Sequence, residues 1–491
     1  MVRRTSHLLR PDPGRVIAKL YLPGEEIASE AGTRAGLLMA RILALPDAEV
    51  SGMLAQTLAL FSTRHQDFEQ VLERNFEQVA HLAGRGPLSR ERRLLIGAYF
   101  THEYSVEGAA LFNPSIVPAP DDAGLGPGQR RFVMSLRAVG EGHISSIEFR
   151  TGVIDEASTI TFDPLGPRLV TGERMPPAYY DRAQFRAKLV ELGAGNELAW
   201  GVLEPLAERF TAAELERSLG LLERTGPQHA ISFQTARTIR ALAASNYVTT
   251  FPEDSVLSQR LIFPGGPHEA HGMEDARFVR FVEDDGSATY YATYTAFDGY
   301  QIVPQLIQTD DFRSFRMVTL NGTAAQNKGM ALFPRRIGGR YVMLSRRDRE
   351  NLHLATSTSV WHWTDVTELH RPAHAWELSQ IGNCGSPIET KAGWLVITHG
   401  VGPMRRYVIS ALLLDLDDPR RVLGQLREPL LAPEGLDREG YVPNVVYSCG
   451  AMVNGNDLVL PYGLSDAAIG LAIVSLPDLL AELRRPASPS S

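Results

Sequence analysis

Cysteine is nearly absent from this sequence. The 491 residues include only Cys384 and Cys449, which lie far apart and lack metal-ligand spacing. Neither a disulfide framework nor a zinc site is therefore suggested, and we expect two buried free thiols. An excess of positive charge is also absent, since the formal net charge is −8. This balance argues against a general nucleic-acid-binding protein, so any anion site must be local.

Long apolar runs are missing as well. No run of eighteen or more apolar residues occurs, and residues 1–7 lack the apolar core and small-residue cleavage site of a signal peptide. We therefore expect a cytoplasmic protein with no membrane partner. Charged residues make up 22% and hydrophobic residues 44%, which is ordinary for a soluble globular protein. The length suits a large repeat-built β domain with helical additions.

Two stretches have the apolar spacing of helices. Residues 1–95 form the first, in which Asp47 follows Pro46 as a reasonable N-cap. The second covers about 176–244, where Thr211 and Glu214 make a capping box. We interpret it as an insertion, because a β pattern stops before it and resumes after it. Residues 481–491 are Pro/Ser-rich and predict a disordered tail.

The β pattern of residues 96–480 repeats itself. A strand, a glycine-containing turn and a second strand recur around Gly286, Gly339, Gly393 and Gly455. Their spacing of roughly fifty to sixty residues is the period of a propeller blade. With the segment around Arg137 as a further copy, the count is five. The fold class is therefore mainly β, with a five-bladed β-propeller as the catalytic domain.

Polar residues end most of the second strands. In a propeller, such equivalent positions converge on one end of the central channel. Side chains that are distant in sequence would then meet in one pocket. The equivalent positions are Arg137, Thr295, Arg346, His399 and Tyr462.

The stretch from His271 to Arg280 places Glu274, Asp275 and Arg277 beside a glycine turn, directly before a β-like run. A carboxyl group held at a strand entrance near a cation is a candidate catalytic acid. The simpler interpretation is a turn whose carboxylates accept backbone N–H bonds. Burial would raise the pKa of Asp275, whereas Arg277 would lower it.

Several motifs in order resemble glycoside hydrolase family 130, the β-mannoside phosphorylases and their relatives, which are five-bladed propellers. The resemblance covers about residues 105–480 without the insertion. Ala276 replaces the proline of the family's Gly-x-Glu-Asp-Pro-Arg, which loosens the turn without removing a functional group. The matching stretches are 272–277, 328–334 leading to 344–347, 398–401, 442–446 and 462–466.

The resemblance implies roles for individual residues. Asp275 corresponds to the proton donor, which in the phosphorylases is thought to act through the sugar 3-hydroxyl. The phosphate-binding positions are matched by Lys328, Arg346, His399 and Tyr407. The sugar-contacting positions are matched by Asn113, Arg137 and Asp466.

These residue types suit inverting phosphorolysis of β-mannosides. An inverting hydrolase needs a second carboxylate to activate water. A phosphorylase replaces that water with phosphate, which is already a nucleophile, and needs cations and hydrogen-bond donors to hold it. The expected products are α-mannose 1-phosphate and a shortened acceptor. We expect no metal or organic cofactor, with inorganic phosphate as co-substrate and a small oligosaccharide as substrate.

Three alternatives stay open. A β-mannoside hydrolase of the same family would use Asp466 or Glu389 as its second carboxylate. A non-catalytic glycan-binding propeller would bind without turnover. A five-bladed glycosidase acting on arabinan or fructan would place acids on three separate blades. The helical additions either close one side of the pocket or form the interface of a homo-oligomer, and the sequence favours neither.

Overall fold

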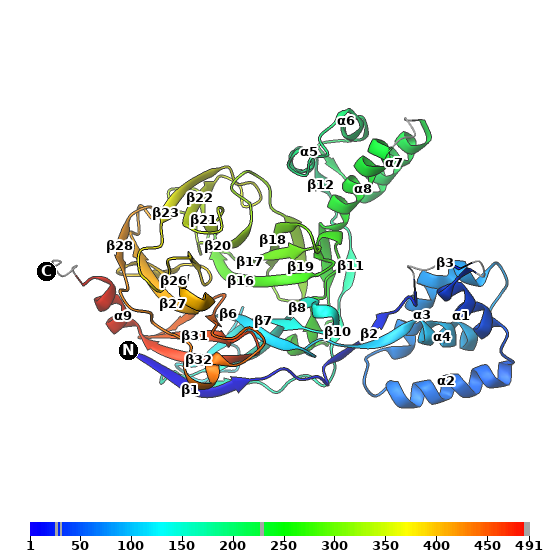
Figure 1. The fold of residues 1–491 in the computed structure, drawn as a ribbon, viewed down its shortest axis with the longest axis horizontal. Coiled ribbons are helices and arrows are strands. Elements are labelled where there is room, and N and C mark those ends of the chain that lie inside the picture. The colour runs from blue at the N-terminus through cyan, green and yellow to red at the C-terminus, as the bar shows by residue number, and fades with distance from the viewer. Residues whose placement is uncertain (25–27, 30–31, 226–229, 486–491) are drawn as a thin grey trace. The chain divides into compact units, whose positions relative to one another are not determined.

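The computed structural model describes residues 1–24, 28–29, 32–225 and 230–485, and the fold is mainly β (Figure 1). The chain divides into two compact units. The smaller unit comprises residues 12–108 and 166–171, and the larger unit comprises the rest. In the part of the chain that is described, no helix is long and apolar enough to cross a membrane.

Within the described residues, the smaller unit contains four α-helices, one β-ribbon and a short pairing of β3 (Ala28–Ser29) with β4 (Gly32–Thr33). Leu72, Val79, Leu95, Ile96 and Phe100 are fully or almost fully buried in its core, which agrees with the helical apolar spacing. The helices are α1 (Arg34–Leu43), α2 (Asp47–Phe61), α3 (Phe68–Val79) and α4 (Arg90–Tyr99), and the ribbon pairs β2 (Val16–Leu20) with β5 (Thr101–Ser105).

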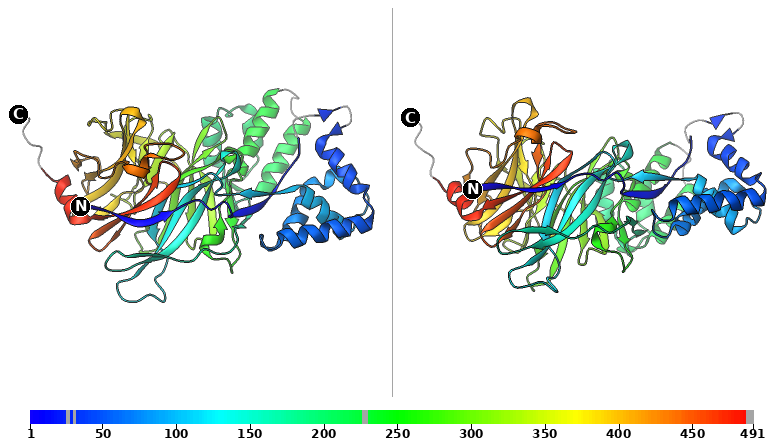
Figure 2. Two further views of the ribbon diagram at one scale, coloured as in Figure 1. Left: turned by 60° about the horizontal axis from the view of Figure 1, so that its bottom comes forward. Right: turned by 90° about the horizontal axis from the view of Figure 1, so that it is seen from below.

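Two expectations for the N-terminal region are wrong. Its first residues are not helical, because β1 (Val2–Leu9) pairs antiparallel with β32 (Ala468–Ser475) in the larger unit. Figure 2 shows this first strand beside the last one. Asp47 is not the N-cap of α2 either. It is the first helical residue, and the cap position is Pro46.

The strands of the larger unit fall into five groups. Strands of one group are near each other along the chain, except that β1 joins the last strands. The second and third groups pair into one ten-stranded sheet. Only one parallel pair, Gly272 opposite Ser145, connects β16 to β8 at the junction. The first group is β1 with β29 (Val446–Tyr447), β30 (Met452–Asn454), β31 (Asp457–Leu464) and β32; the second is β6 (Ala110–Pro118), β7 (Arg130–Val139), β8 (Ser145–Ile154) and β9 (Ile160–Phe162). The third is β11 (Glu173–Met175), β14 (Tyr247–Thr250), β16 (Gly272–Val282), β17 (Ala288–Phe297), β18 (Ile302–Thr309) and β19 (Ser314–Thr319).

Two further sheets of this unit have four and five strands, and a separate two-stranded sheet pairs β12 (Tyr180–Asp181) with β13 (Arg209–Phe210). The fourth group is β20 (Lys328–Leu332), β21 (Tyr341–Arg346), β22 (Leu352–Ser357) and β23 (Asp365–His370). The fifth is β24 (Gln380–Asn383), β25 (Ile388–Thr390), β26 (Gly393–Val401), β27 (Tyr407–Leu414) and β28 (Val422–Gln425). Strand cores such as Val396, Leu412 and Leu460 are fully buried. Their near-continuous apolar runs are typical of strands covered on both faces.

The predicted glycine turns lie where strands reverse. Gly286 separates β16 from β17 and Gly339 separates β20 from β21, with φ of 85° and 74°. Gly455 separates β30 from β31 with φ of 57°. Left-handed backbone of this kind costs glycine nothing sterically, which explains its recurrence at these turns.

The insertion forms its own helical cluster within the larger unit. Thr211 Oγ1 accepts from the backbone N–H of Glu214, and Glu214 Oε2 accepts from the N–H of Thr211, which confirms the capping box. The cluster packs around Leu189, Val202 and Phe210. Its helices are α5 (Arg182–Glu191), α6 (Glu197–Leu203), α7 (Ala212–Thr225) and α8 (Ala230–Ala244).

Two smaller expectations can be compared directly. Cys384 and Cys449 are both buried free thiols, as predicted. The tail does not begin at residue 481, because α9 (Leu476–Leu483) continues to Leu483, whose side chain is buried. Residues 486–491 of the expected tail lie outside the described residues.

Candidate active site

Asp275 lies in a bulge near the start of β16. The pairing of β16 with β17 shifts register between Glu274 and Arg277, and Asp275 has left-handed backbone with φ of 56°. A bulge leaves a residue out of the ladder and turns its side chain away from the regular alternation. Gly272 precedes it with φ of 126°, where a Cβ atom would lie 2.5 Å from Ser145 Oγ. Glycine is therefore required there for close backbone approach.

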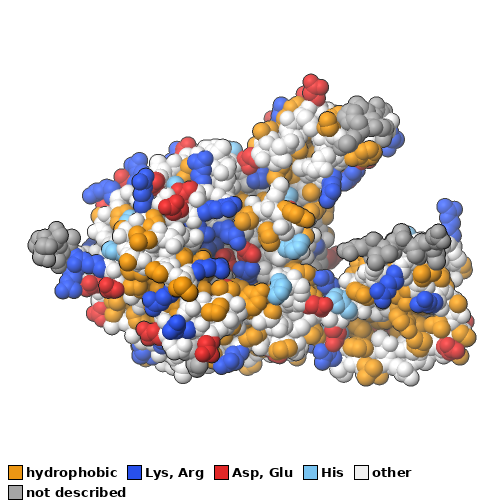
Figure 3. Space-filling view, viewed as in Figure 1, with side chains coloured by type: hydrophobic (Ala, Val, Ile, Leu, Met, Phe, Trp, Pro, Cys, Tyr) orange, Lys and Arg blue, Asp and Glu red, His pale blue; other side chains and the backbone are white. Residues whose placement is uncertain are grey.

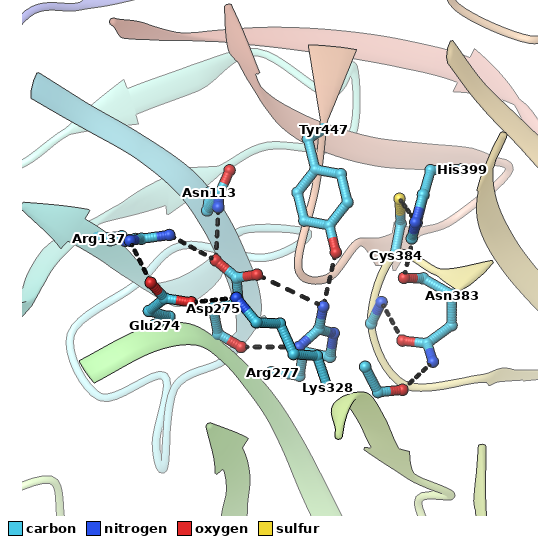
Figure 4. Close-up of polar contacts among 12 residues, drawn as sticks. Asn113, Arg137, Glu274, Asp275, Arg277, Lys328, Asn383, Cys384, His399 and Tyr447 are labelled. Carbon is cyan, nitrogen blue, oxygen red and sulfur yellow. Dashed lines mark hydrogen bonds and ion pairs between the residues drawn. The ribbon is translucent and has the colours of Figure 1, made fainter. Parts of the chain in front are cut away.

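Asn113 faces Asp275 from a second bulge. The β6–β7 ladder shifts register between Phe112 and Ser115, and Asn113 has φ of 49°. Its Nδ2 donates to Oδ1 of Asp275 at 2.6 Å (Figure 4). Asn and Asp tolerate left-handed backbone better than most residues, so both bulges have suitable side chains.

A network of charges surrounds Asp275. Arg137 NH1 lies 3.3 Å from Asp275 Oδ1, and its NH2 donates to Glu274 Oε1 at 2.9 Å. Lys328 Nζ donates to Glu274 Oε2 at 2.7 Å. The Arg137 guanidinium also lies over the Phe112 ring, 5.0 Å from its centroid. In Figure 3, side chains of both charge signs gather in a hollow in the middle of the strand-built face.

A deeper cation fixes the backbone of the bulge. Arg277 is 2% exposed, and its NH1 donates to the carbonyl of Asp275 at 3.0 Å. Its NH2 donates to the hydroxyl of Tyr447 at 2.7 Å and lies 3.9 Å from Asp275 Oδ2. Arg277 therefore both holds the bulge and adds positive charge beneath the carboxylate.

These cations determine the charge of Asp275. Burial alone would raise its pKa, but Arg137, Arg277 and Lys328, together with the hydrogen bond from Asn113, lower it to about 2. The cationic neighbours therefore outweigh burial. Asp275 is a carboxylate at neutral pH in this structure.

Arg346 and His399 form a second cluster. Arg346 NH1 lies 3.1 Å from His399 Nε2, and His399 Nδ1 lies 3.2 Å from the carbonyl oxygen of Asn383. A guanidinium only donates and a carbonyl only accepts, so this geometry requires a neutral imidazole with its proton on Nδ1. Burial, with Arg346 and Arg277 nearby, places the pKa of His399 well below its ordinary value, consistent with that tautomer.

The guanidinium of Arg346 is short of acceptors. Its Nε is buried without a hydrogen-bond partner, and among the described residues it forms no ion pair with a carboxylate. Arg346 lies directly opposite Lys328 in the β20–β21 ladder, so the two side chains share one face. Tyr407 stacks on the His399 ring with centroids 5.9 Å apart. All four predicted phosphate-binding residues are therefore linked by contact or by strand pairing.

Asp466 follows β31 in left-handed backbone with φ of 52°. Burial, together with the charge of Asp275, raises its pKa to about 6 against the opposing effect of Arg137. The mutual influence with Arg137 and Asp275 places this carboxyl group in the same site. All eight predicted site residues thus belong to the two clusters.

Some expected residues lie elsewhere. Glu389 pairs with Arg335 at 2.7 Å on the surface. With Pro118 and Val282, at the far ends of β6 and β16, it lines a different cavity, so it is wrong as a candidate base. Tyr462, predicted as a convergent channel residue, is buried in an apolar cluster with Leu460, and the Arg4 guanidinium lies 5.9 Å from its ring centroid.

Sequence reasoning did not assign five residues to the site. Glu274 and Arg277 were named within the motif, and Arg277 was expected to lower the pKa of Asp275, but neither was predicted as a site residue. Tyr447 directly follows the matched stretch 442–446, which could have indicated it. Gln380, whose Nε2 lies 3.3 Å from His399 Nε2, and Asn383 act through His399, and no local signal in the sequence marks them.

Comparison with known proteins identifies the family of this chain. Residues 253–485 match a family model, glycoside hydrolase family 130, described as β-1,4-mannooligosaccharide phosphorylase. The 1,2-β-oligomannan phosphorylase of Thermoanaerobacter sp. (strain X514) is 37% identical over 223 residues, which are 43% of this chain and 71% of that protein. The β-1,2-mannobiose phosphorylase of the same organism is 36% identical over 217 residues, covering 42% and 68%.

A solved structure is also similar. The β-1,2-mannobiose phosphorylase from Listeria innocua, in complex with β-1,2-mannobiose, aligns with a TM-score of 0.45 and 22% identity, covering 77% of this chain and 93% of that one. The family model and the extent of the match to the Thermoanaerobacter proteins confirm the resemblance that the motifs carried. The chain belongs to glycoside hydrolase family 130.

Proposed function

We propose that this chain catalyses inverting phosphorolysis of β-mannosides, in which a β-mannoside and inorganic phosphate give α-mannose 1-phosphate and a shortened acceptor. Phosphorylases of β-linked mannosides are its characterised relatives. The observation that carries the proposal is Arg346, a guanidinium without a carboxylate partner among the described residues, in the same site as the acid Asp275. Such a guanidinium is suited to bind an oxyanion.

The two clusters suit the two faces of the sugar. Asp275, with Asn113 and Arg137, would contact the mannosyl unit and serve as the proton donor. Arg346, Lys328 and Tyr407 would hold phosphate for attack on the anomeric carbon from the opposite face, with His399 of the predicted phosphate-binding set holding the Arg346 guanidinium in place. The bond between that carbon and the glycosidic oxygen breaks as the carbon–phosphate oxygen bond forms. Inversion follows from this in-line geometry.

The low pKa of Asp275 bears on the source of the proton. A carboxyl group with a pKa of about 2 is ionised before substrates bind. Converting hydrogen phosphate and a mannoside into mannose 1-phosphate and an alcohol moves the phosphate's proton to the leaving oxygen, so Asp275 ends as it began. Phosphate dianion beside Lys328 would offset the cations and raise the pKa of Asp275, allowing it to relay that proton.

The five groups of strands are proposed to be the blades of a five-bladed propeller. The ten-stranded sheet divides naturally where one pair joins β16 to β8. The pairing of β1 with β32 unites the two ends of the chain in one sheet. Asn113, Asp275, Lys328 and His399 come from four of the five groups, and their proximity is expected if the groups surround a central channel.

The test is product analysis on β-1,2-, β-1,3- and β-1,4-linked mannobioses, each with and without inorganic phosphate. We expect phosphate-dependent α-mannose 1-phosphate, reduced roughly 1000-fold by Asp275→Asn, as for loss of a general acid. Glu389→Gln is the matched control, because it removes a carboxylate outside the site, and should leave the rate unchanged.

Hydrolysis is the second candidate, and Asp466 favours it. A buried carboxyl group with a pKa of about 6 would be ionised at neutral pH and able to activate water. Free mannose released equally well without phosphate, and lost in Asp466→Asn, would replace the phosphorylase proposal with this one. No turnover of any mannoside, with glycan binding retained in Asp275→Asn, would instead indicate a binding protein.

A further inference from the structure

A second cavity lies between the helical insertion and the sheet that carries β19. Its volume is about 170 Å³, below the range typical of pockets for drug-sized ligands. One wall comes from Tyr179, Gln184 and Lys188, and the other from Arg316 and Trp361. The walls are joined by hydrogen bonds, including Lys188 Nζ to the carbonyl of Leu320 at 2.8 Å. None of these residues belongs to the proposed active site.

Two arginines of this cavity lie over aromatic rings. The Arg209 guanidinium lies 4.8 Å from the centroid of Tyr179, and that of Arg316 lies 5.3 Å from the centroid of Trp361. Neither guanidinium forms an ion pair within the described part of the chain. Stacking leaves the N–H groups at the guanidinium edge free to bind an oxyanion in a bidentate manner.

The charge balance of the lining is positive. Partial desolvation lowers the pKa of the solvent-exposed Arg316, and the nearby Arg209 also lowers it, so the two cations repel each other. Asp181 is the acidic residue of the lining and stands opposite Arg209 in the ladder of β12 (Tyr180–Asp181) and β13 (Arg209–Phe210). Its Oδ1 accepts from the N–H of Gln184. A bound anion would relieve the repulsion between the arginines.

A buried acceptor in the same cavity points to a hydroxylated ligand. Asn321 is 3% exposed, and its Oδ1 has no hydrogen-bond partner in the described structure. Its Nδ2 donates to the carbonyl of Gln184 at 3.4 Å, which fixes the amide so that Oδ1 is the unpaired atom. A buried acceptor without a hydrogen-bond partner is unfavourable, and a ligand hydroxyl would satisfy it.

We propose that this cavity binds a phosphorylated monosaccharide. Arg209 and Arg316 would hold the phosphate, and Asn321 would accept from a sugar hydroxyl. Tyr179 and Trp361, each with one ring face covered by an arginine, would border the sugar ring with their remaining apolar surface. The small volume restricts the ligand to a single ring. This site does not depend on the activity proposed for Asp275.

The experiment is calorimetric titration of the full-length protein with mannose 6-phosphate, mannose and inorganic phosphate. We expect mannose 6-phosphate to bind at least roughly tenfold more tightly than either of the other two, a difference of about 1.4 kcal/mol. Arg316→Gln and Arg209→Gln should each weaken that binding by about tenfold or more. Both arginine side chains are exposed, so the thermal melting curves of these variants should match the wild type.

Two control variants locate the binding. Arg335→Gln removes another arginine that stacks on a ring, 4.9 Å from the centroid of Trp394, and should leave the affinity unchanged. Lys328→Gln alters the proposed active site and should also leave it unchanged. Loss of binding in Lys328→Gln but not in Arg316→Gln would assign the signal to the active site and overturn the proposal. Equal affinity for inorganic phosphate, equal affinity for mannose, or no binding of mannose 6-phosphate would overturn it as well.

Discussion

The ammonium group of Lys328 is tied to Glu274, with Nζ 2.7 Å from Oε2. The other carboxylate oxygen of Glu274 accepts from Arg137 at 2.9 Å. Glu274 therefore connects a residue of the proposed sugar side to a residue of the proposed phosphate side. Its charge also compensates two of the three cations that lower the pKa of Asp275.

Glu274→Gln should separate substrate binding from turnover. Removing the negative charge leaves Lys328 and Arg137 uncompensated, so the site becomes more attractive to phosphate and the pKa of Asp275 falls further. We expect kcat for phosphorolysis to fall about tenfold or more, while the KM for phosphate falls or stays the same. Steady-state kinetics with varied phosphate measure both. An increase in the KM for phosphate at unchanged kcat would contradict this role.

Asn113→Asp tests the contact that supports Asp275. The variant keeps the shape of the side chain and its tolerance of left-handed backbone, but it places a second carboxyl group against Oδ1. Two adjacent carboxylates do not both ionise readily. We expect kcat/KM to fall roughly 100-fold at pH 8, the scale of a lost hydrogen bond to a charged group.

The deficit of Asn113→Asp should shrink toward pH 5.5. At lower pH, repulsion from Asp275 favours protonation of the introduced carboxyl group, which then donates a hydrogen bond as the amide did. Kinetics of the variant and the wild type across pH 5.5–8.5 make this comparison. A deficit that is the same at every pH would mean that the amide acts on the sugar and not on Asp275.

Asp466 should destabilise the fold above about pH 6. Its pKa is raised from 3.8 to about 6 in the folded state, so the folded state holds this proton more tightly than the unfolded state. Stability is therefore lost as pH rises from about 4 to 6, and the cost is complete above 6. Two pKa units correspond to at most about 3 kcal/mol.

Asp466→Asn removes this cost. The variant should melt at higher temperature than the wild type at pH 8, and the gain should vanish near pH 4. Glu389→Gln is a control of opposite sign, because Arg335 lowers the pKa of Glu389. The Glu389–Arg335 ion pair is exposed, so its loss should lower the free energy of unfolding by no more than about 1 kcal/mol at pH 8. A gain in Asp466→Asn that is equal at both pH values would show that the carboxyl group is not desolvated.

Much of the site could be predicted because its residues recur at equivalent places in a repeat. Arg137, Arg346 and His399 each occur near the end of the second strand of a repeat. That position can be identified in the sequence from the turn glycines and the apolar runs. Asn113 and Asp275 were matched through their motifs. Their bulges were not predictable, because left-handed backbone at these residues depends on how β6 and β16 pack together.

Other features depend on contacts that no local pattern encodes. Val2–Leu9 is a strand because β32, at the other end of the chain, pairs with it. The charge of Asp275 could not be decided either, since burial and Arg277 act in opposite directions. The structure shows that Arg137 and Lys328 also lower the pKa of Asp275, and these cations come from different strands.

The role of His399 can be separated from that of Arg346 by two substitutions. The neutral imidazole accepts from Arg346 through Nε2 at 3.1 Å, so its function in this geometry is to hold the guanidinium in place. His399→Gln supplies an amide oxygen at a similar reach and should keep the KM for phosphate within a few-fold of the wild type. His399→Ala removes the acceptor and should raise that KM about tenfold or more, the scale of a lost hydrogen bond to a charged group. Equal losses in both variants would show that the imidazole itself binds phosphate, in which case phosphate must first displace Arg346 from Nε2.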